Sequence, residues 1–191
     1  MPRRIWRFLL KFYFMIFGNK EVVELDKFKW DICYKTELAR YLNDFQKPGT
    51  RHDFNLKNFS ILYSHGHGYC GFESVYQDAT YTLVLTYDNE AIACIGFEVV
   101  DGSAILIKQI QGVKGRLTIL KYFRWEKMLL NIAMDWAKNA GFKAVKIIRG
   151  ESSGWYSPYL AQSLFMKYDV TARRSGFKFD EENKTYFRNL A

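Results

Sequence analysis

The chain has 191 residues, which is enough for one domain with a hydrophobic core of its own. Hydrophobic residues make up 49% of the chain and aromatic residues 18%, and this composition excludes an intrinsically disordered protein. The formal net charge of +8 is unevenly spread, because the first twenty residues hold five cations and no acid. We therefore divide the chain into a basic segment, residues 1–20, and an α/β domain, residues 21–191.

The basic segment combines cations with a broad apolar face. On a helical wheel Arg4, Arg7 and Lys11 fall on one narrow face, with Arg3 at its edge. The uninterrupted apolar run, residues 12–17, is far too short to span a bilayer, and no small-residue cleavage site follows it. Two interpretations stay open: an amphipathic helix lying on an anionic membrane surface, and a helix packed on this domain or on a partner.

The charge beyond residue 20 and the cysteines bear on nucleic-acid binding and on the cellular compartment. No basic stripe continues past the first twenty residues, which argues against specific nucleic-acid binding. The three cysteines lack CxxC spacing and are typical of reduced thiols, so we expect a cytoplasmic protein, peripheral at the inner face of a membrane if the basic segment binds lipid. His65, His67 and Cys70 lie close together, but no second cluster supplies further ligands, so we predict a glycine-rich turn and no metal site.

The first predicted elements are a helix and two strands. Apolar residues at helical spacing predict a helix over residues 35–46, with Thr36 as its N-cap. Pro48-Gly49 marks a loop after this helix. Residues 59–63 and 69–76 then predict strands from their aromatic and β-branched content.

Residues 80–111 predict an antiparallel meander. Three β-rich runs occupy residues 80–87, 91–100 and 104–111. Asp88-Asn89 and Asp101-Gly102 separate them, and both pairs are typical of tight hairpin turns.

The last third of the chain alternates helices and strands. An apolar stripe predicts a helix over residues 125–139, and residues 142–148 predict a strand parallel to the third meander strand. A second helix over residues 159–174 and a closing hairpin of residues 177–179 and 184–190 follow. The predicted fold class is α/β, with a mixed, largely antiparallel sheet flanked by helices.

This order of elements, with a helix that ends in Arg-Arg-Ser-Gly-Phe (residues 173–177) and a terminal hairpin, resembles the GNAT superfamily of N-acyltransferases over residues 80–191. In that family, backbone amides of a loop after the fourth strand bind the pyrophosphate of acyl-coenzyme A. Gln109 and Gly112 match the loop pattern, whereas Lys114 stands where a second glycine is usual. The resemblance implies that the phosphates of acetyl-CoA or another acyl-CoA are held by Gln111, Gly112, Lys114, Gly115 and Arg116.

The resemblance also implies a catalytic tyrosine four residues before the Gly-Phe pair. That position is Ala172, and Tyr168 lies one helical turn earlier, so we predict Tyr168 as the general acid. Glu151 follows the strand at 142–148, on the acceptor side, and is the predicted base. The sequence therefore predicts an acyl-coenzyme A-dependent N-acyltransferase acting on an unidentified amine. The alternative is a non-catalytic GNAT-like binding or scaffold protein at a membrane surface or in an assembly.

Overall fold

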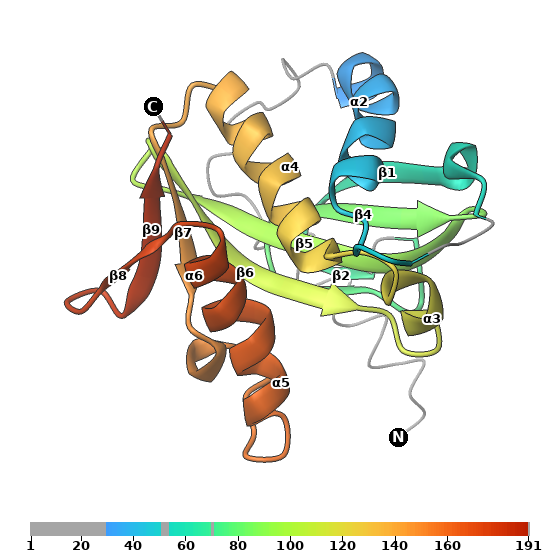
Figure 1. The fold of residues 1–191 in the computed structure, drawn as a ribbon. Helices are drawn as coiled ribbons and strands as arrows, with labels where there is room; N and C mark the ends of the chain where they lie inside the picture. The colour runs from blue at the N-terminus through green and yellow to red at the C-terminus, as the bar shows by residue number, and fades with distance from the viewer. Residues whose placement is uncertain (1–29, 51–53, 70, 191) are drawn as a thin grey trace, which may run out of the picture.

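The computed structural model describes residues 30–50, 54–69 and 71–190, so the basic segment lies outside the described residues. Its centre is a seven-stranded sheet in the order β1-β4-β5-β6-β7-β9-β8, beside a two-stranded ribbon of β2 and β3 (Figure 1). The strands are β1 (Phe59–His65), β2 (Gly68–Tyr69), β3 (Tyr76–Gln77), β4 (Tyr81–Tyr87), β5 (Glu90–Val100), β6 (Ala104–Gly112), β7 (Ala144–Ile148), β8 (Lys178–Asp180) and β9 (Thr185–Asn189).

Two long helices, α2 and α4, lie on one face of the sheet (Figure 1). The helices are α2 (Trp30–Asp44), α3 (Leu117–Leu120), α4 (Trp125–Asn139), α5 (Ala161–Phe165), the π-helical turn η4 (Met166–Val170) and α6 (Thr171–Arg174), with short 3-10 turns η2 (Leu56–Asn58) and η3 (Gly150–Ser152). The prediction of α4 is confirmed. Because α2 begins at Trp30, Thr36 lies inside this helix, and its prediction as the N-cap was wrong.

The predicted meander is confirmed in β4, β5 and β6, which pair antiparallel in sequence order. Asp88 and Asn89 have φ angles of 51° and 62°, and Asp101 and Gly102 have φ angles of 54° and 59°. Two successive positive φ angles are the backbone signature of the tight turn that fits the twist of a hairpin. The sheet has the mixed, largely antiparallel pairing that the sequence predicts.

The single strand predicted over residues 69–76 was wrong. The chain turns at Gly71, whose φ of +84° is unfavourable for other residues, and only β2 and β3 pair across the resulting ribbon. Val75, between them, is fully buried in a small cluster with Val84 and Cys94. This segment therefore covers sheet residues that do not belong to the main core.

The main core lies between the sheet and its helices, and α4 contributes more buried side chains to it than any other described helix. The apolar stripe of α4 is buried and includes Met128, Leu129, Ile132, Ala133 and Trp136. This helix contacts β5, β6 and β7. Complete burial of each large side chain contributes roughly 1.5–3 kcal/mol, so packing holds α4 on the sheet.

The parallel pair of β6 and β7 is short and then parts. Ala104–Ile107 of β6 pairs with Ala144–Ile147 of β7, as predicted, but β6 continues to Gly112 without this partner. At the point of parting, the register against β5 shifts so that Lys108 is an extra residue of β6. A bulge of this kind bends its strand, and here it directs the end of β6 away from β7.

Candidate functional site

The end of β6 has one edge that faces away from β5. Val113 donates its N–H to Ile92 O of β5 at 2.8 Å. Because successive residues of a strand direct their peptide groups to opposite edges, Ile110 and Gly112 direct theirs toward the gap beside β7. A strand edge of this kind is able to bind an extended molecule through its peptide groups.

The hydroxyl of Tyr168 lies in this gap. It accepts a hydrogen bond from the N–H of Ile110 at 3.1 Å and donates one to Lys108 O at 3.1 Å. The side chain is 2% exposed, and burial raises the pKa of Tyr168 to about 12. The phenol therefore keeps its proton at neutral pH.

A π-helical turn brings Tyr168 to this position. Residues 161–174 form one helical run in which η4 interrupts the α-helical period. Its residues Tyr168 and Asp169 are both 2% exposed, although they are neighbours in sequence. Single π-turns are rare in proteins, and those that occur are often found at functional sites. This one directs two consecutive polar side chains, Tyr168 and Asp169, into the protein.

Two clefts border the gap. The first, which we call the tyrosine cleft, has a volume of about 320 Å³. Its lining includes Gln109–Gln111 of β6 and Leu164, Lys167 and Tyr168 of the helical run. The second, which we call the aspartate cleft, has a volume of about 390 Å³. Its lining includes His67, Gln77, Asp78, Lys108 and Ser152.

Tyr76 and Trp155 line both clefts and form the wall between them. Their rings meet edge to face with centroids 6.4 Å apart. The indole N–H of Trp155 donates to the carboxylate of Asp78. Tyr69 meets Tyr76 edge to face at 5.4 Å, which extends the aromatic row along the tyrosine cleft.

Gln109 holds the ribbon segment onto β6. Its side chain is 2% exposed; it accepts from the Asp78 N–H at 3.1 Å and donates to Tyr76 O at 2.6 Å. A Cβ atom at Gly96 would lie 3.0 Å from Gln109 Oε1 and 3.1 Å from Ala79 Cβ, so this glycine leaves room for the amide. Gln109 thereby positions two residues of the cleft walls.

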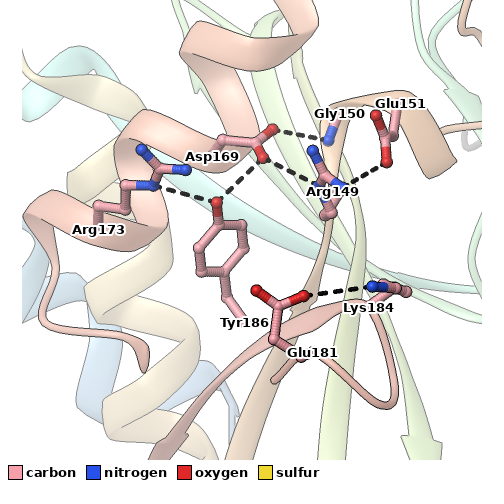
Figure 2. A network of polar contacts seen from close by, with 8 residues as sticks. All are labelled: Arg149, Gly150, Glu151, Asp169, Arg173, Glu181, Lys184 and Tyr186. Atoms are coloured by element: carbon pink, nitrogen blue, oxygen red, sulfur yellow. Dashed lines mark hydrogen bonds and ion pairs between the residues drawn. The ribbon is translucent and has the colours of Figure 1, made fainter. Parts of the chain in front are cut away.

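A buried carboxylate holds the loop after β7, as Figure 2 shows. Asp169 accepts from the Gly150 N–H at 2.9 Å and from the Tyr186 hydroxyl at 3.1 Å, and its Oδ1 lies 3.6 Å from Arg149 Nε. Arg173 donates to the Tyr186 hydroxyl at 3.1 Å. These contacts join the helical run, β9 and the loop that carries Trp155.

Gly150 permits the close approach of this loop to the helical run. A Cβ atom there would lie 2.7 Å from Leu164 C and 2.8 Å from Phe165 N, which are backbone atoms. No side chain fits at these distances without a shift of the backbone. The position of the loop is therefore fixed by packing and by the Asp169 carboxylate together.

The residues predicted to hold phosphates lie partly at the tyrosine cleft and partly in the exposed loop after β6. Gln111 lines the tyrosine cleft, and its side chain accepts from Gln109 Nε2 at 2.8 Å. A Cβ atom at Gly112 would lie 3.1 Å from Leu117 Cδ2, 3.3 Å from Leu120 Cδ1 and 3.3 Å from Trp125 Cζ2. The chain's own apolar side chains therefore occupy the space beside this glycine.

The other members of the predicted loop face solvent. Lys114 and Gly115 are exposed, and Arg116 forms an ion pair with Glu90. The four-residue α3 follows, and α4 begins at Trp125, so the loop does not open directly into the long helix.

Of the two predicted catalytic residues, Tyr168 lines one of the two clefts and Glu151 lines neither. Tyr168 lines the tyrosine cleft, whereas Glu151 is exposed, pairs with Arg149 at 2.5 Å and is not among the lining residues of either cleft. Sequence reasoning missed Tyr76, Asp78 and Asp169. Their roles depend on contacts with residues far along the chain, and no local motif marks them.

Comparisons with known proteins concern the fold. No protein-family model matches the sequence, and no curated protein matches it either. Within the part of the chain that the structure describes, no helix has the length and apolar character needed to cross a membrane.

Solved structures of GNAT acetyltransferases are similar in arrangement. One from Elizabethkingia anophelis, with acetyl-CoA bound, is 17% identical with a TM-score of 0.45, over 70% of this chain and 97% of that one. One from Staphylococcus aureus is 14% identical with a TM-score of 0.41, over 58% and 68%. An Escherichia coli N-acetyltransferase in complex with CoA is 17% identical with a TM-score of 0.38, over 59% of this chain and 60% of its own length. The similarity concerns the arrangement of helices and strands.

Proposed function

We propose that this chain is an acyl-coenzyme A-dependent N-acyltransferase. In this proposal the tyrosine cleft receives the acyl donor and the aspartate cleft receives the amine. The two reactants meet at Lys108, which lines the aspartate cleft and whose carbonyl bonds Tyr168 of the tyrosine cleft. The observation that carries it is the parting of β6 from β7 beside the buried, protonated Tyr168. The resemblance of residues 80–191 to GNAT enzymes supports acyl-coenzyme A as the acyl donor.

The free edge of β6 suits the amide-bearing arm of coenzyme A. An extended molecule with amide groups adds to a strand edge through main-chain hydrogen bonds. The Ile110 N–H is already bonded to Tyr168, so the groups that this edge offers in the gap are the Ile110 carbonyl and the peptide groups of Gly112. Lys167, half-buried in the tyrosine cleft, supplies a cation for a phosphate, and Lys114 and Gly115 lie just past the end of β6. Acyl-coenzyme A, when bound, would supply the acyl group as an activated thioester.

Tyr168 and Asp78 are the proposed acid and base. The amine of the acceptor forms the new C–N bond as the C–S bond of the thioester breaks. The Tyr168 hydroxyl, which otherwise donates to Lys108 O, gives its proton to the departing sulfur, and the carboxylate of Asp78 takes the proton that the amine loses. Asp78 replaces Glu151 in this role because it lines the cleft.

The aspartate cleft has a second polar group suited to the acceptor. Among the described residues, Gln77 Nε2 is buried without a hydrogen-bond partner, and Gln77 lines this cleft. A buried donor without a partner is destabilising, and an oxygen of the acceptor would satisfy it.

A second candidate function is a GNAT-like scaffold without catalysis. The observation that favours it is the space beside Gly112, which Leu117, Leu120 and Trp125 close. A protein of this kind would keep the fold and its clefts as a binding surface.

Calorimetric titration with acetyl-CoA and an acetylation assay over a panel of primary amines test the proposal. We expect wild type to bind acetyl-CoA and to acetylate at least one amine. Tyr168→Phe removes the proton donor, so kcat should fall on the order of 100-fold while the affinity for acetyl-CoA changes little.

Tyr41→Phe is the matched control. Tyr41 is also a buried tyrosine, but its hydroxyl bonds Asp135 at the contact of α2 with α4, outside both clefts. This variant should keep the wild-type kcat. Absence of acetyl-CoA binding at millimolar concentrations would reject the proposal in favour of the scaffold.

A further inference from the structure

The segment from Trp155 to Met166 exposes an unusual amount of apolar surface. Ten large hydrophobic side chains are exposed among the described residues, and six of them fall in this segment. They are Trp155 (53% exposed), Tyr156 (47%), Tyr159 (95%), Leu160 (38%), Phe165 (42%) and Met166 (49%). Exposed apolar residues that are concentrated in this way mark an interaction surface.

The composition of this segment is that of a membrane-interface element. Residues 155–166 include no Asp, Glu, Lys or Arg. One tryptophan and two tyrosines lie at its start, and these amphipathic rings are favoured at the level of lipid headgroups. In Figure 1, α5 and the turn before it project from the body of the protein, where a flat surface can reach them.

Cations border the apolar segment. Lys167 follows it directly, and the guanidinium of Arg173 lies 5.8 Å from the centre of the Phe165 ring. The first twenty residues of the same chain add five cations and no acid. Apolar surface beside cations is complementary to anionic headgroups over a hydrocarbon layer, and each cation near such a surface adds attraction.

We propose that the segment Trp155–Met166 is a docking surface for an anionic lipid membrane. The exposed side chains of Tyr156, Tyr159, Phe165 and Met166 enter the interface, and Arg173 stays among the headgroups. A shallow, interfacial mode fits the helices of the described residues, since none is able to span a bilayer. The proposal concerns binding and does not depend on acyl transfer.

The Tyr159→Trp variant of the full chain tests insertion directly. Position 159 is almost fully exposed, so the new indole reports its surroundings without disturbing the core. Addition of vesicles of equimolar phosphatidylcholine and phosphatidylglycerol should move the tryptophan emission maximum of this variant to shorter wavelength, and by more than it moves the emission maximum of wild type. Vesicles of phosphatidylcholine alone should shift it less. If the protein co-sediments with anionic vesicles and this emission does not move, another part of the chain binds lipid and the proposal fails.

A triple variant, Tyr159→Ser with Phe165→Ser and Met166→Ser, measures the contribution of the segment. Its partition onto the anionic vesicles should fall about tenfold or more, because three apolar side chains no longer enter the interface. Leu62→Ser is the matched control, since Leu62 is 45% exposed on β1 at the opposite edge of the sheet, and it should bind as wild type does. Equal partition of wild type, the triple variant and Leu62→Ser would overturn the proposal. So would a wild-type protein that is a dimer without vesicles when the triple variant is a monomer.

Discussion

The loop after β6 and the loop after β7 leave neighbouring strands of one sheet, and different forces hold them in place. The first is held by apolar packing, with Leu117, Leu120 and Trp125 closed around Gly112. The second is held by a buried carboxylate, Asp169, and by backbone contact at Gly150. Gly112, which matches a family motif, has packed apolar side chains beside it. The loop after β7 carries no recognisable motif, yet it supplies Ser152 and Trp155 to the cleft walls.

The largest expected effect is the loss of the carboxylate. Asp169→Ala leaves Arg149 and the Gly150 N–H without their buried partner, so the free energy of unfolding should fall by about 3–5 kcal/mol. Urea unfolding measures this. Glu181→Ala is the control, because its pair with Lys184 in the same region (Figure 2) is exposed and contributes little. Equal losses in the two variants would show that the second loop is not held by charge.

A smaller loss is expected when the glycine of the second loop gains a methyl group. Gly150→Ala places a Cβ atom against the backbone of Leu164 and Phe165, so unfolding should become easier by roughly 2–3 kcal/mol. Gly154→Ala, four residues later, has open space around its Cβ position and should unfold as wild type does. Wild-type stability of Gly150→Ala in thermal and urea unfolding would mean that the loop moves freely, against the close packing described above.

The smallest effect is expected in the first loop, and it sharpens the comparison most. Gly112→Ala meets the ends of Leu117, Leu120 and Trp125, which are able to shift, so it should cost about 1 kcal/mol or less. Its affinity for acetyl-CoA in calorimetry should equal that of wild type. A variant that keeps its stability and loses this affinity would instead identify the loop as the phosphate cradle that the sequence resemblance implies.

Local signals in the sequence were sufficient for most of the fold. The turns at Asp88-Asn89 and Asp101-Gly102 depend only on the conformations that their own residues prefer, and the α4 stripe depends only on helical spacing. Phe59–His65 likewise forms a strand where its β-branched and aromatic residues predict one.

The site could not be predicted to the same extent, because its contacts join distant residues. Gln109 matches a motif position, yet its side chain holds Tyr76 and Asp78, about thirty residues away. Tyr168 could be named from its spacing to Ala172, but no sequence pattern shows that a π-turn would direct both it and Asp169 inward. The ribbon of β2 and β3 was predicted as one strand, because its turn depends on a positive φ at Gly71 and the sequence does not show that this glycine takes it.

The adjacency of Tyr168 and Asp169 on one turn also determines how the clefts are able to move. One side chain bonds the bent end of β6, and the other bonds the Gly150 N–H in the loop that leads to Trp155. A displacement of η4 along the helix axis therefore shifts both hydrogen-bonded contacts at once, the one from Tyr168 to β6 and the one from Asp169 to Gly150. Widening of the tyrosine cleft at Tyr168 must be accompanied by a change at the wall that the two clefts share.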